Sequence, residues 1–170
     1  MFDQLEALIF DFDGVLTDDR VWVDQSGREM VCCNRRDGLA FDVLRKHEIK
    51  MYILSTETNP VVLKRGKKIK IQVHHCSKDK LASLAKLAES QKFSLKNTFY
   101  IGNDVNDYFA MKACGYSACP ADSHSKIKDI AMFPLKTKGG HGVVRELVES
   151  VFRLDMMSVL FNPSLKELNL

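Results

Sequence analysis

The sequence predicts an α/β fold, a three-layer α/β/α Rossmann-like sandwich built around a parallel sheet. Short apolar runs rich in β-forming residues alternate with segments of helical periodicity. The runs are apolar at nearly every position, which is typical of strands covered by helices on both faces. With 170 residues, the chain has the size of one domain with a substantial core, and we expect a single domain over residues 1–170.

The elements follow one another in regular order along the chain. The runs expected to be strands are Ala7–Phe10, Lys50–Leu54, Ile71–His75, Thr98–Ile101 and Tyr116–Cys119. The segments expected to be helices are Asp37–His47, Pro60–Lys68, Lys78–Gln91, Asn106–Cys114 and Ser123–Ala131. The dipeptide Asn59-Pro60 favours a helix start, with a capping residue before a proline at the first helical position.

Two segments depart from this alternation. Residues 20–34, "RVWVDQSGREMVCCN", are predicted to form a β-hairpin that turns at Gln25-Ser26-Gly27. The final part, residues 142–170, is expected to be an amphipathic helix over Gly142–Leu154 followed by a tail. The hairpin is therefore an insertion after the first strand of the sheet.

Composition excludes several classes of function. The formal net charge is only +3, from 25 basic and 22 acidic residues, which does not indicate a nucleic-acid partner. No segment approaches the roughly 18 apolar residues of a membrane span, and the acidic N-terminus is unlike a signal peptide. The five cysteines show no CxxC spacing. We interpret them as reduced thiols and expect a cytoplasmic protein.

Polar residues stand where several predicted strands end, and ligands of such sheets bind at the carboxyl ends of the strands. Residues of this kind are Asp11 and Asp13 after the first strand, Ser55 after the second, Lys80 at the helix after the third, and Asn103 and Asp104 after the fourth. Carboxylates crowded together repel unless a cation lies between them. Oxygen ligands suit Mg²⁺, and a site of this kind can hold a phosphoryl group while one aspartate attacks phosphorus and the other moves protons.

These residues also resemble a known family. "DFDGVLTD", Ser55 after an apolar strand, Lys80 and "GNDVND" resemble the four motifs of the haloacid dehalogenase superfamily of phosphatases, and the resemblance covers residues 7 to about 148. It implies that Asp11 is the nucleophile of an aspartyl-phosphate mechanism and that Asp13 is the acid/base. It further implies that Ser55 and Lys80 hold the phosphoryl oxygens and that Mg²⁺ is the cofactor.

The expected metal ligands leave one alternative open. Asp11 and the backbone carbonyl of Asp13 are two of them by the resemblance. The family usually has an aspartate directly after the glycine of the fourth motif, where this chain has Asn103 followed by Asp104. Either side chain can complete the metal shell, and both are kept as candidates.

The resemblance extends to one subfamily. The segments between the first three motifs hold only the hairpin and two helices, so no cap domain is expected. The hairpin with "SGRE", and "RRDGLAF", "DKL" and "KGGHGVVRELVE", are similar to the capless phosphatases that act on 3-deoxy-octulosonate 8-phosphate or on nine-carbon sugar acid 9-phosphates. That similarity implies a homotetramer in which hairpins pair and active sites borrow residues from a neighbour.

The segment after the second motif indicates the substrate. The eight-carbon enzymes typically carry Thr-Gly-Arg, whereas this chain has Ser-Thr-Glu ending at Glu57. Glu57 together with Arg65 and Lys68 resembles the nine-carbon pattern, and two bases three residues apart share a helix face that suits a carboxylate. An alternative interpretation of these bases is a solvated helix face. Further substrate contacts are expected from Thr56, Arg36 and His141.

The sequence thus predicts a Mg²⁺-dependent phosphatase for the 9-phosphate of a 2-keto-3-deoxy nine-carbon sugar acid, that is, of deaminated or N-acyl neuraminate. A phosphatase for 3-deoxy-octulosonate 8-phosphate is the first alternative. The second is a non-catalytic tetramerisation module, like the domain attached to sialic acid cytidylyltransferases.

Overall fold

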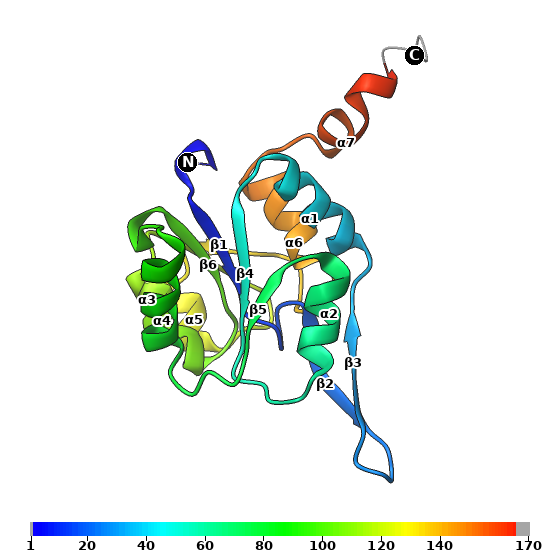
Figure 1. Ribbon diagram of the computed structural model, residues 1–170, viewed down its shortest axis with the longest axis vertical. Helices are drawn as coiled ribbons and strands as arrows, with labels where there is room; N and C mark the ends of the chain where they lie inside the picture. The colour runs from blue at the N-terminus through cyan, green and yellow to red at the C-terminus, as the bar shows by residue number, and fades with distance from the viewer. Residues whose placement is uncertain (1, 166–170) are drawn as a thin grey trace.

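The architecture is a six-stranded, fully parallel sheet between two layers of helices (Figure 1), in the order β5-β4-β1-β6-β7-β8. The structure is a computed structural model that describes residues 2–165, with side chains through residue 161. The strands of this sheet are β1 (Ala7–Phe10), β4 (Lys50–Leu54), β5 (Gln72–His74), β6 (Thr98–Ile101), β7 (Tyr116–Cys119) and β8 (Phe133–Pro134). The predicted α/β sandwich is confirmed. The two-residue β8 was not expected, because it is too short to give a periodic pattern.

Each face of the sheet is covered by three helices, which meet it through separate apolar clusters (Figure 1). Helices α1 (Arg36–Lys46), α2 (Val61–Ile69) and α6 (Val143–Glu146) cover one face, and α3 (Lys80–Gln91), α4 (Tyr108–Ala113) and α5 (Ser125–Ile130) cover the other. In β1, Leu8 and Phe10 enter the first cluster while Ala7 and Ile9 enter the second. This alternation explains why the strand is apolar at every position.

Several helix starts and ends differ from the sequence prediction because side chains cap them. Asp79 accepts a hydrogen bond from the Ala82 N–H at 3.0 Å, so α3 begins at Lys80 and not at Lys78. The helix expected from Asn106 is divided into a 3₁₀ turn, η3 (Val105–Asp107), and α4, because Asp104 and Asp107 form a capping box. Short 3₁₀ turns also occupy η1 (Phe2–Gln4) and η2 (Leu95–Asn97).

The C-terminal part contains one more helix than expected. The helix predicted over Gly142–Leu154 is wrong at its end, since α6 passes into a π-helical turn, η4 (Leu147–Val151), and stops there. Helix α7 (Met156–Leu165) follows, packs on α1, and receives hydrogen bonds from Lys46 Nζ to the carbonyls of Val159 and Leu160 at 2.9 and 3.1 Å. These tertiary contacts are invisible in local sequence. Residues 166–170 of the expected tail lie outside the described residues, and no helix within 2–165 is long and apolar enough to cross a bilayer.

The predicted hairpin forms a separate antiparallel pair, β2 (Thr17–Val23) and β3 (Glu29–Cys33), which extends away from the body (Figure 1). Its turn uses Gly27 at φ +79°, where a glycine is at ease, and Asp24, whose Oδ1 accepts the Ser26 N–H at 2.8 Å. Val31 of the hairpin packs against the core, whereas four other large apolar side chains are more than half exposed: Val21, Trp22, Val23 and Met30. Such a surface indicates a partner.

The buried carboxyl of Asp37 links α1 to α6, two helices on the same face of the sheet. Asp37, in the first turn of α1, is 1% exposed, and its Oδ1 accepts the Arg145 N–H of α6 at 3.1 Å. Its Oδ2 has no hydrogen-bond partner among the described atoms. Burial raises the pKa of Asp37 from 3.8 to about 6, against the hydrogen bonds from α6.

Replacing this carboxyl should change how stability depends on pH. The native state holds the Asp37 proton up to about pH 6 while the unfolded state releases it near its ordinary pKa, so the free energy of unfolding falls as the pH rises between these values. We expect the stability of Asp37→Asn relative to wild type to rise by about 2 kcal/mol when the pH is raised from about 4.5 to about 8. Urea unfolding at both pH values measures it. An equal difference at both would contradict the buried charge, and exposed Asp129→Asn is the control.

Candidate active site

The carboxyl ends of β4, β1 and β6 bring the predicted site residues to one edge of the sheet. The register pairs Phe10 with Ile53 and with Ile101. Ser55 and Asn103, each two residues further on, therefore come level with Phe12, between Asp11 and Asp13. Adjacent parallel strands place these groups side by side.

The loop after β1 is shaped by a glycine and a threonine. Gly14 has φ +72°, and a Cβ there would lie 1.8 Å from the Asn103 Nδ2, so a side chain is excluded on both grounds. The Thr17 hydroxyl accepts the Gly14 N–H at 3.2 Å and contacts Asp13 Oδ1 at 3.2 Å. Thr17 is thus the residue that orients the Asp13 carboxyl. No role for Thr17 was predicted from the sequence, although it stands inside the motif "DFDGVLTD".

A buried ion triad lies directly behind this loop. Lys80 Nζ is 2.7 Å from Asp11 Oδ2 and 2.7 Å from Asp107 Oδ1, and all three side chains are at least nine-tenths buried. Asp107 also accepts the Tyr100 hydroxyl at 2.8 Å and the backbone N–H of Asn103 at 2.9 Å. Asp107 therefore ties together β6, α3 and the loop of residues 11–16, which is called the nucleophile loop after the predicted role of Asp11.

Tyr100 is the part of this network that the sequence analysis missed. It is fully buried in β6 and donates to the same Asp107 oxygen that receives Lys80. In the sequence it is indistinguishable from an ordinary aromatic strand residue. Only its distance from Asp107 shows its contribution.

The electrostatics of the triad favour an additional cation. Burial, and then the charge of Asp107, raise the pKa of Asp11 well above its ordinary value despite Lys80. Burial opposes the charged form of Lys80, but Asp11 and Asp107 outweigh it and raise its pKa. One ammonium group thus faces two carboxylates, and a cation beside Asp11 would favour its ionised form.

The donor groups beside Asp11 fit a magnesium ion. One terminal atom of the Asn103 amide lies 2.9 Å from the Asp13 carbonyl oxygen and 3.2 Å from Asp11 Oδ2; as nitrogen it donates to both. Turned to present its oxygen, the amide joins these two groups in an all-oxygen set of the kind Mg²⁺ prefers. Within the described residues no cluster of three or more His, Cys, Asp and Glu side chains forms a metal site, and here an amide and a backbone carbonyl supply two of the three donors.

Asp104, the alternative to Asn103, is placed differently. Its side chain is exposed and caps η3, accepting the Val105 N–H at 2.7 Å. Asn103 is buried against Asp11 and Asp13. The geometry favours Asn103 as the ligand and leaves Asp104 as a nearby charge.

The segment after β4 brings the charge of Glu57 within electrostatic range of Asp13. Ser55 is buried, and its hydroxyl accepts the Glu57 N–H at 3.0 Å. Burial raises the pKa of Asp13, and the charge of Glu57 adds to this against the hydrogen bond from Thr17. A raised pKa suits a general acid. Thr56 is exposed at the mouth of the same edge.

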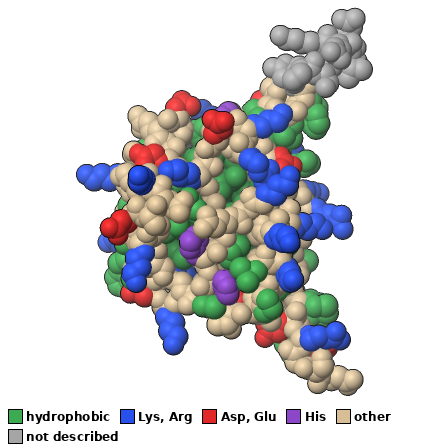
Figure 2. All heavy atoms as spheres, viewed as in Figure 1, with side chains coloured by type: hydrophobic (Ala, Val, Ile, Leu, Met, Phe, Trp, Pro, Cys, Tyr) green, Lys and Arg blue, Asp and Glu red, His purple; other side chains and the backbone are tan. Residues whose placement is uncertain are grey.

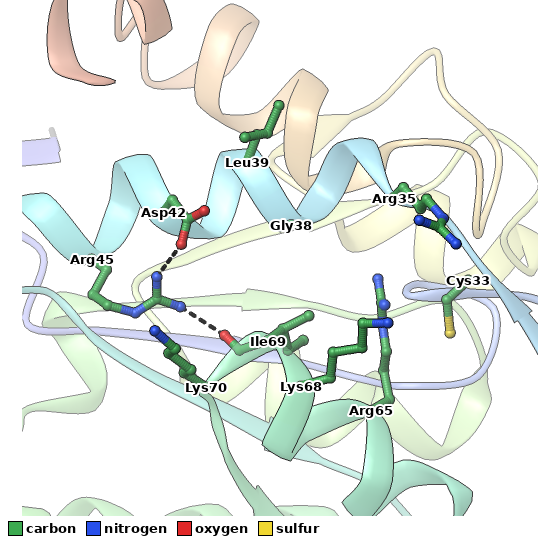
Figure 3. Close-up of a pocket in the computed structure, with 10 residues that line it drawn as sticks. All are labelled: Cys33, Arg35, Gly38, Leu39, Asp42, Arg45, Arg65, Lys68, Ile69 and Lys70. Atoms are coloured by element: carbon green, nitrogen blue, oxygen red, sulfur yellow. Dashed lines mark hydrogen bonds and ion pairs between the residues drawn. The ribbon is translucent and has the colours of Figure 1, made fainter. Parts of the chain in front are cut away.

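Arg65 and Lys68 lie elsewhere, in a groove of about 540 Å³ between α1 and α2 (Figure 3). Its basic side chains are Arg35, Arg45, Arg65, Lys68 and Lys70. Asp42, its acidic side chain, is bound to Arg45. Figure 2 shows Lys and Arg gathered on the side where α1 and α2 lie. None of Asp11, Asp13 or Lys80 lines the groove.

Arg36 and His141 line a second, smaller cavity beside the glycine-rich loop 139–142. His141 Nδ1 is 2.6 Å from the Gly139 carbonyl. The loop itself packs on the nucleophile loop: Gly140 N–H donates to the Val15 carbonyl at 3.0 Å, and a Cβ on Gly139 would lie 2.2 Å from the Gly14 oxygen. The structure thus brings these two candidates together, next to the loop that carries Asp13.

Comparison with known proteins agrees with this geometry. A sequence model of the haloacid dehalogenase-like hydrolases matches residues 39–147. The chain belongs to this family. Among solved structures, a protein assigned to the same family from Streptomyces avermitilis is 38% identical, with a TM-score of 0.83, covering 97% of this chain and 90% of that one.

Two curated relatives differ in length and activity. The 3-deoxy-D-manno-octulosonate 8-phosphate phosphatase KdsC of Haemophilus influenzae is 29% identical over 94% of this chain and 89% of its own. N-acylneuraminate cytidylyltransferase A of Danio rerio is 28% identical over 88% of this chain, which spans only 35% of that protein. The cobalt-bound structure of the Haemophilus influenzae phosphatase has a TM-score of 0.84 at 29% identity, covering 89% of this chain and 90% of that one.

Removing the Lys80 ammonium group from the triad should strongly destabilise this protein. Lys80→Met leaves Asp11 and Asp107 buried without their counter-charge. We expect the free energy of unfolding to fall by about 3–5 kcal/mol, measured by urea unfolding at neutral pH. The exposed Lys86→Met on the same helix should change little. An unfolding midpoint for Lys80→Met equal to that of Lys86→Met would show that the triad does not support the fold.

Proposed function

We propose that this protein is a Mg²⁺-dependent phosphatase for the 9-phosphate of a nine-carbon 2-keto-3-deoxy sugar acid. The observation that carries the proposal is the buried set of Asp11, Lys80 and Asn103 around the Asp13 carbonyl. A family whose relatives include sugar-acid phosphatases supports it. We place the protein in the cytoplasm on the sequence argument alone.

The residues divide the reaction into two displacements. An Asp11 carboxylate oxygen attacks phosphorus, and the bond from phosphorus to the sugar oxygen breaks as the Asp13 carboxyl gives that oxygen its proton. Water then attacks the aspartyl-phosphate, Asp13 takes the proton of that water, and phosphate leaves with Asp11 restored. Lys80 and Ser55 hold phosphoryl oxygens, and the raised pKa of Asp13 suits its first role.

Magnesium would be held by Asp11, the Asp13 carbonyl and Asn103. When bound, it supplies positive charge that stabilises the phosphoryl oxygens and the ionised form of Asp11. The cobalt-bound relative supports a divalent cation here.

The substrate class is inferred from Glu57. Glu57 follows Ser55 at the catalytic edge and its charge acts on Asp13, and a carboxylate there suits hydroxyl groups of a neutral sugar chain better than a second anion. The eight-carbon 8-phosphate remains the alternative, favoured by the similarity to KdsC. A non-catalytic assembly module is the second alternative, favoured by the similarity to the cytidylyltransferase and by Asn103 in the fourth motif.

Assembly completes the proposed site. Asp11 and Asp13 do not line the groove that holds Arg65 and Lys68, and these bases would meet a substrate carboxylate in a neighbouring copy. We therefore propose a homotetramer with active sites between subunits. Arg36 and His141, beside the nucleophile loop, are proposed as additional substrate contacts, as is Thr56.

Phosphate release is the experiment that tests this function. The nine-carbon 9-phosphate and the octulosonate 8-phosphate are compared, each with Mg²⁺ and with chelator, and Asp11→Asn is the blank. We expect metal-dependent release that is faster from the nine-carbon substrate, and kcat/KM on that substrate reduced about tenfold or more by Glu57→Arg.

Two other results would contradict the proposed function or its substrate. Faster release from the eight-carbon substrate would contradict the role given to Glu57. No release from either, with Asp11→Asn indistinguishable from wild type, would favour the assembly module.

If the exposed hairpin is the pairing surface, a polar substitution on it should weaken the oligomer. Trp22 is 67% exposed opposite Met30, and burying such a side chain contributes about 1.5–3 kcal/mol per copy. We expect Trp22→Ser to shift the mass measured by light scattering toward smaller species, whereas Gln25→Ser at the turn should not. A tetramer unchanged at low micromolar concentration would show that the hairpin is not the pairing surface.

A further inference from the structure

Two hydrogen bonds fasten the hairpin to the α2 region. Asn59 Nδ2 donates to Glu29 Oε2 at 3.1 Å, and Arg65 Nη2 donates to the Asn34 carbonyl at 2.8 Å. Glu29 begins β3 and Asn34 follows it, so the bonds hold both ends of the strand that packs on α2. A two-stranded hairpin is marginal by itself, and its placement therefore depends on such anchors.

Asn59 takes part in three connections at once. Its side-chain nitrogen reaches Glu29 on the hairpin. Its Oδ1 accepts the Val61 N–H at 3.0 Å and so starts α2. Its backbone N–H donates to Glu57 Oε1 at 2.7 Å. One residue thus connects the hairpin, the helix that carries Arg65, and the Glu57 carboxylate.

Glu57 is held tightly by its own loop. Oε1 accepts the Thr58 N–H at 2.6 Å in addition to that of Asn59. The Glu57 carbonyl accepts the Cys76 N–H at 3.0 Å. These hydrogen bonds join residues of the loops at the catalytic edge. The hydrogen bond from Asn59 to Glu29, in contrast, joins that edge to the hairpin.

We propose that Asn59 and Glu29 are positioning residues that make substrate recognition by Glu57 depend on the placement of the hairpin. The nature of the substrate rests on the proposed function. Neither residue bonds to Asp11, Asp13 or Lys80, so they act on substrate affinity and leave the phosphoryl chemistry intact. Since the hairpin is also the proposed pairing surface, assembly and substrate affinity are linked through this bond.

The test removes the acceptor on the hairpin and observes the loop by two independent methods. Hydrogen exchange of a peptide covering residues 55–61 is measured for wild type, Glu29→Ala and Glu29→Gln, with exposed Glu89→Ala on α3 as the matched control. Kinetics are measured on the nine-carbon 9-phosphate and on p-nitrophenyl phosphate, which lacks the sugar acid.

We expect Glu29→Ala to accelerate exchange about 2- to 10-fold and to raise KM for the sugar phosphate by a similar factor. Its kcat, and its turnover of p-nitrophenyl phosphate, should change less than about twofold. Glu29→Gln keeps an oxygen acceptor and should behave like wild type, as should Glu89→Ala.

Unchanged exchange in Glu29→Ala overturns the proposal. Equal losses on both phosphate esters overturn it as well, because they show a general structural effect. Accelerated exchange in a protein whose wild type releases no phosphate from any ester supports the link between hairpin and loop, and it is the proposed function that then fails.

Discussion

The buried triad of Asp11, Lys80 and Asp107 is the constraint on which the catalytic edge of the sheet depends. Two carboxylates share one ammonium group out of contact with water, and a buried charge that lost its partner would cost several kcal/mol. The relative positions of β1, β6 and α3 must therefore keep these ion pairs and hydrogen bonds intact. Tyr100 donates to the Asp107 oxygen that also binds Lys80, and the backbone N–H of Asn103 donates to the other oxygen, which leaves Asp11 as the group that still benefits from a cation.

At the same edge of the sheet, two glycines lie so close to neighbouring groups that neither position can carry a side chain. Gly14 lies against Asn103, and Gly139 lies against the Gly14 carbonyl. The nucleophile loop is thus held from one side by β6 and from the other by the glycine-rich loop. This packing gives a physical role to "KGGHG", in which the glycines allow close approach and His141 remains exposed beside them.

The residues proposed to contact the substrate belong to two surfaces of different charge. Glu57 stands with Asp13 at the catalytic edge, whereas Arg65 and Lys68 line the α1–α2 groove. We propose that the two surfaces serve one substrate where two copies of the chain meet. The hairpin, which presents apolar side chains to solvent and is anchored at Asn59 and Arg65, is the element best placed to bring them together.

The sequence by itself determined the sheet and its polar edge. β1, β4, β6 and β7 have the predicted bounds, because strands covered on both faces must be apolar throughout. The residues at their ends could be named for the same reason. Tertiary structure alone decided what depends on distance: the burial of Asn103 against Asp11 while Asp104 stays exposed, the bond from Tyr100 to Asp107, the placement of α7 on α1, and the location of Arg65 in the α1–α2 groove. Local sequence encodes periodicity and turn chemistry, whereas these features arise from contacts between segments far apart in the chain.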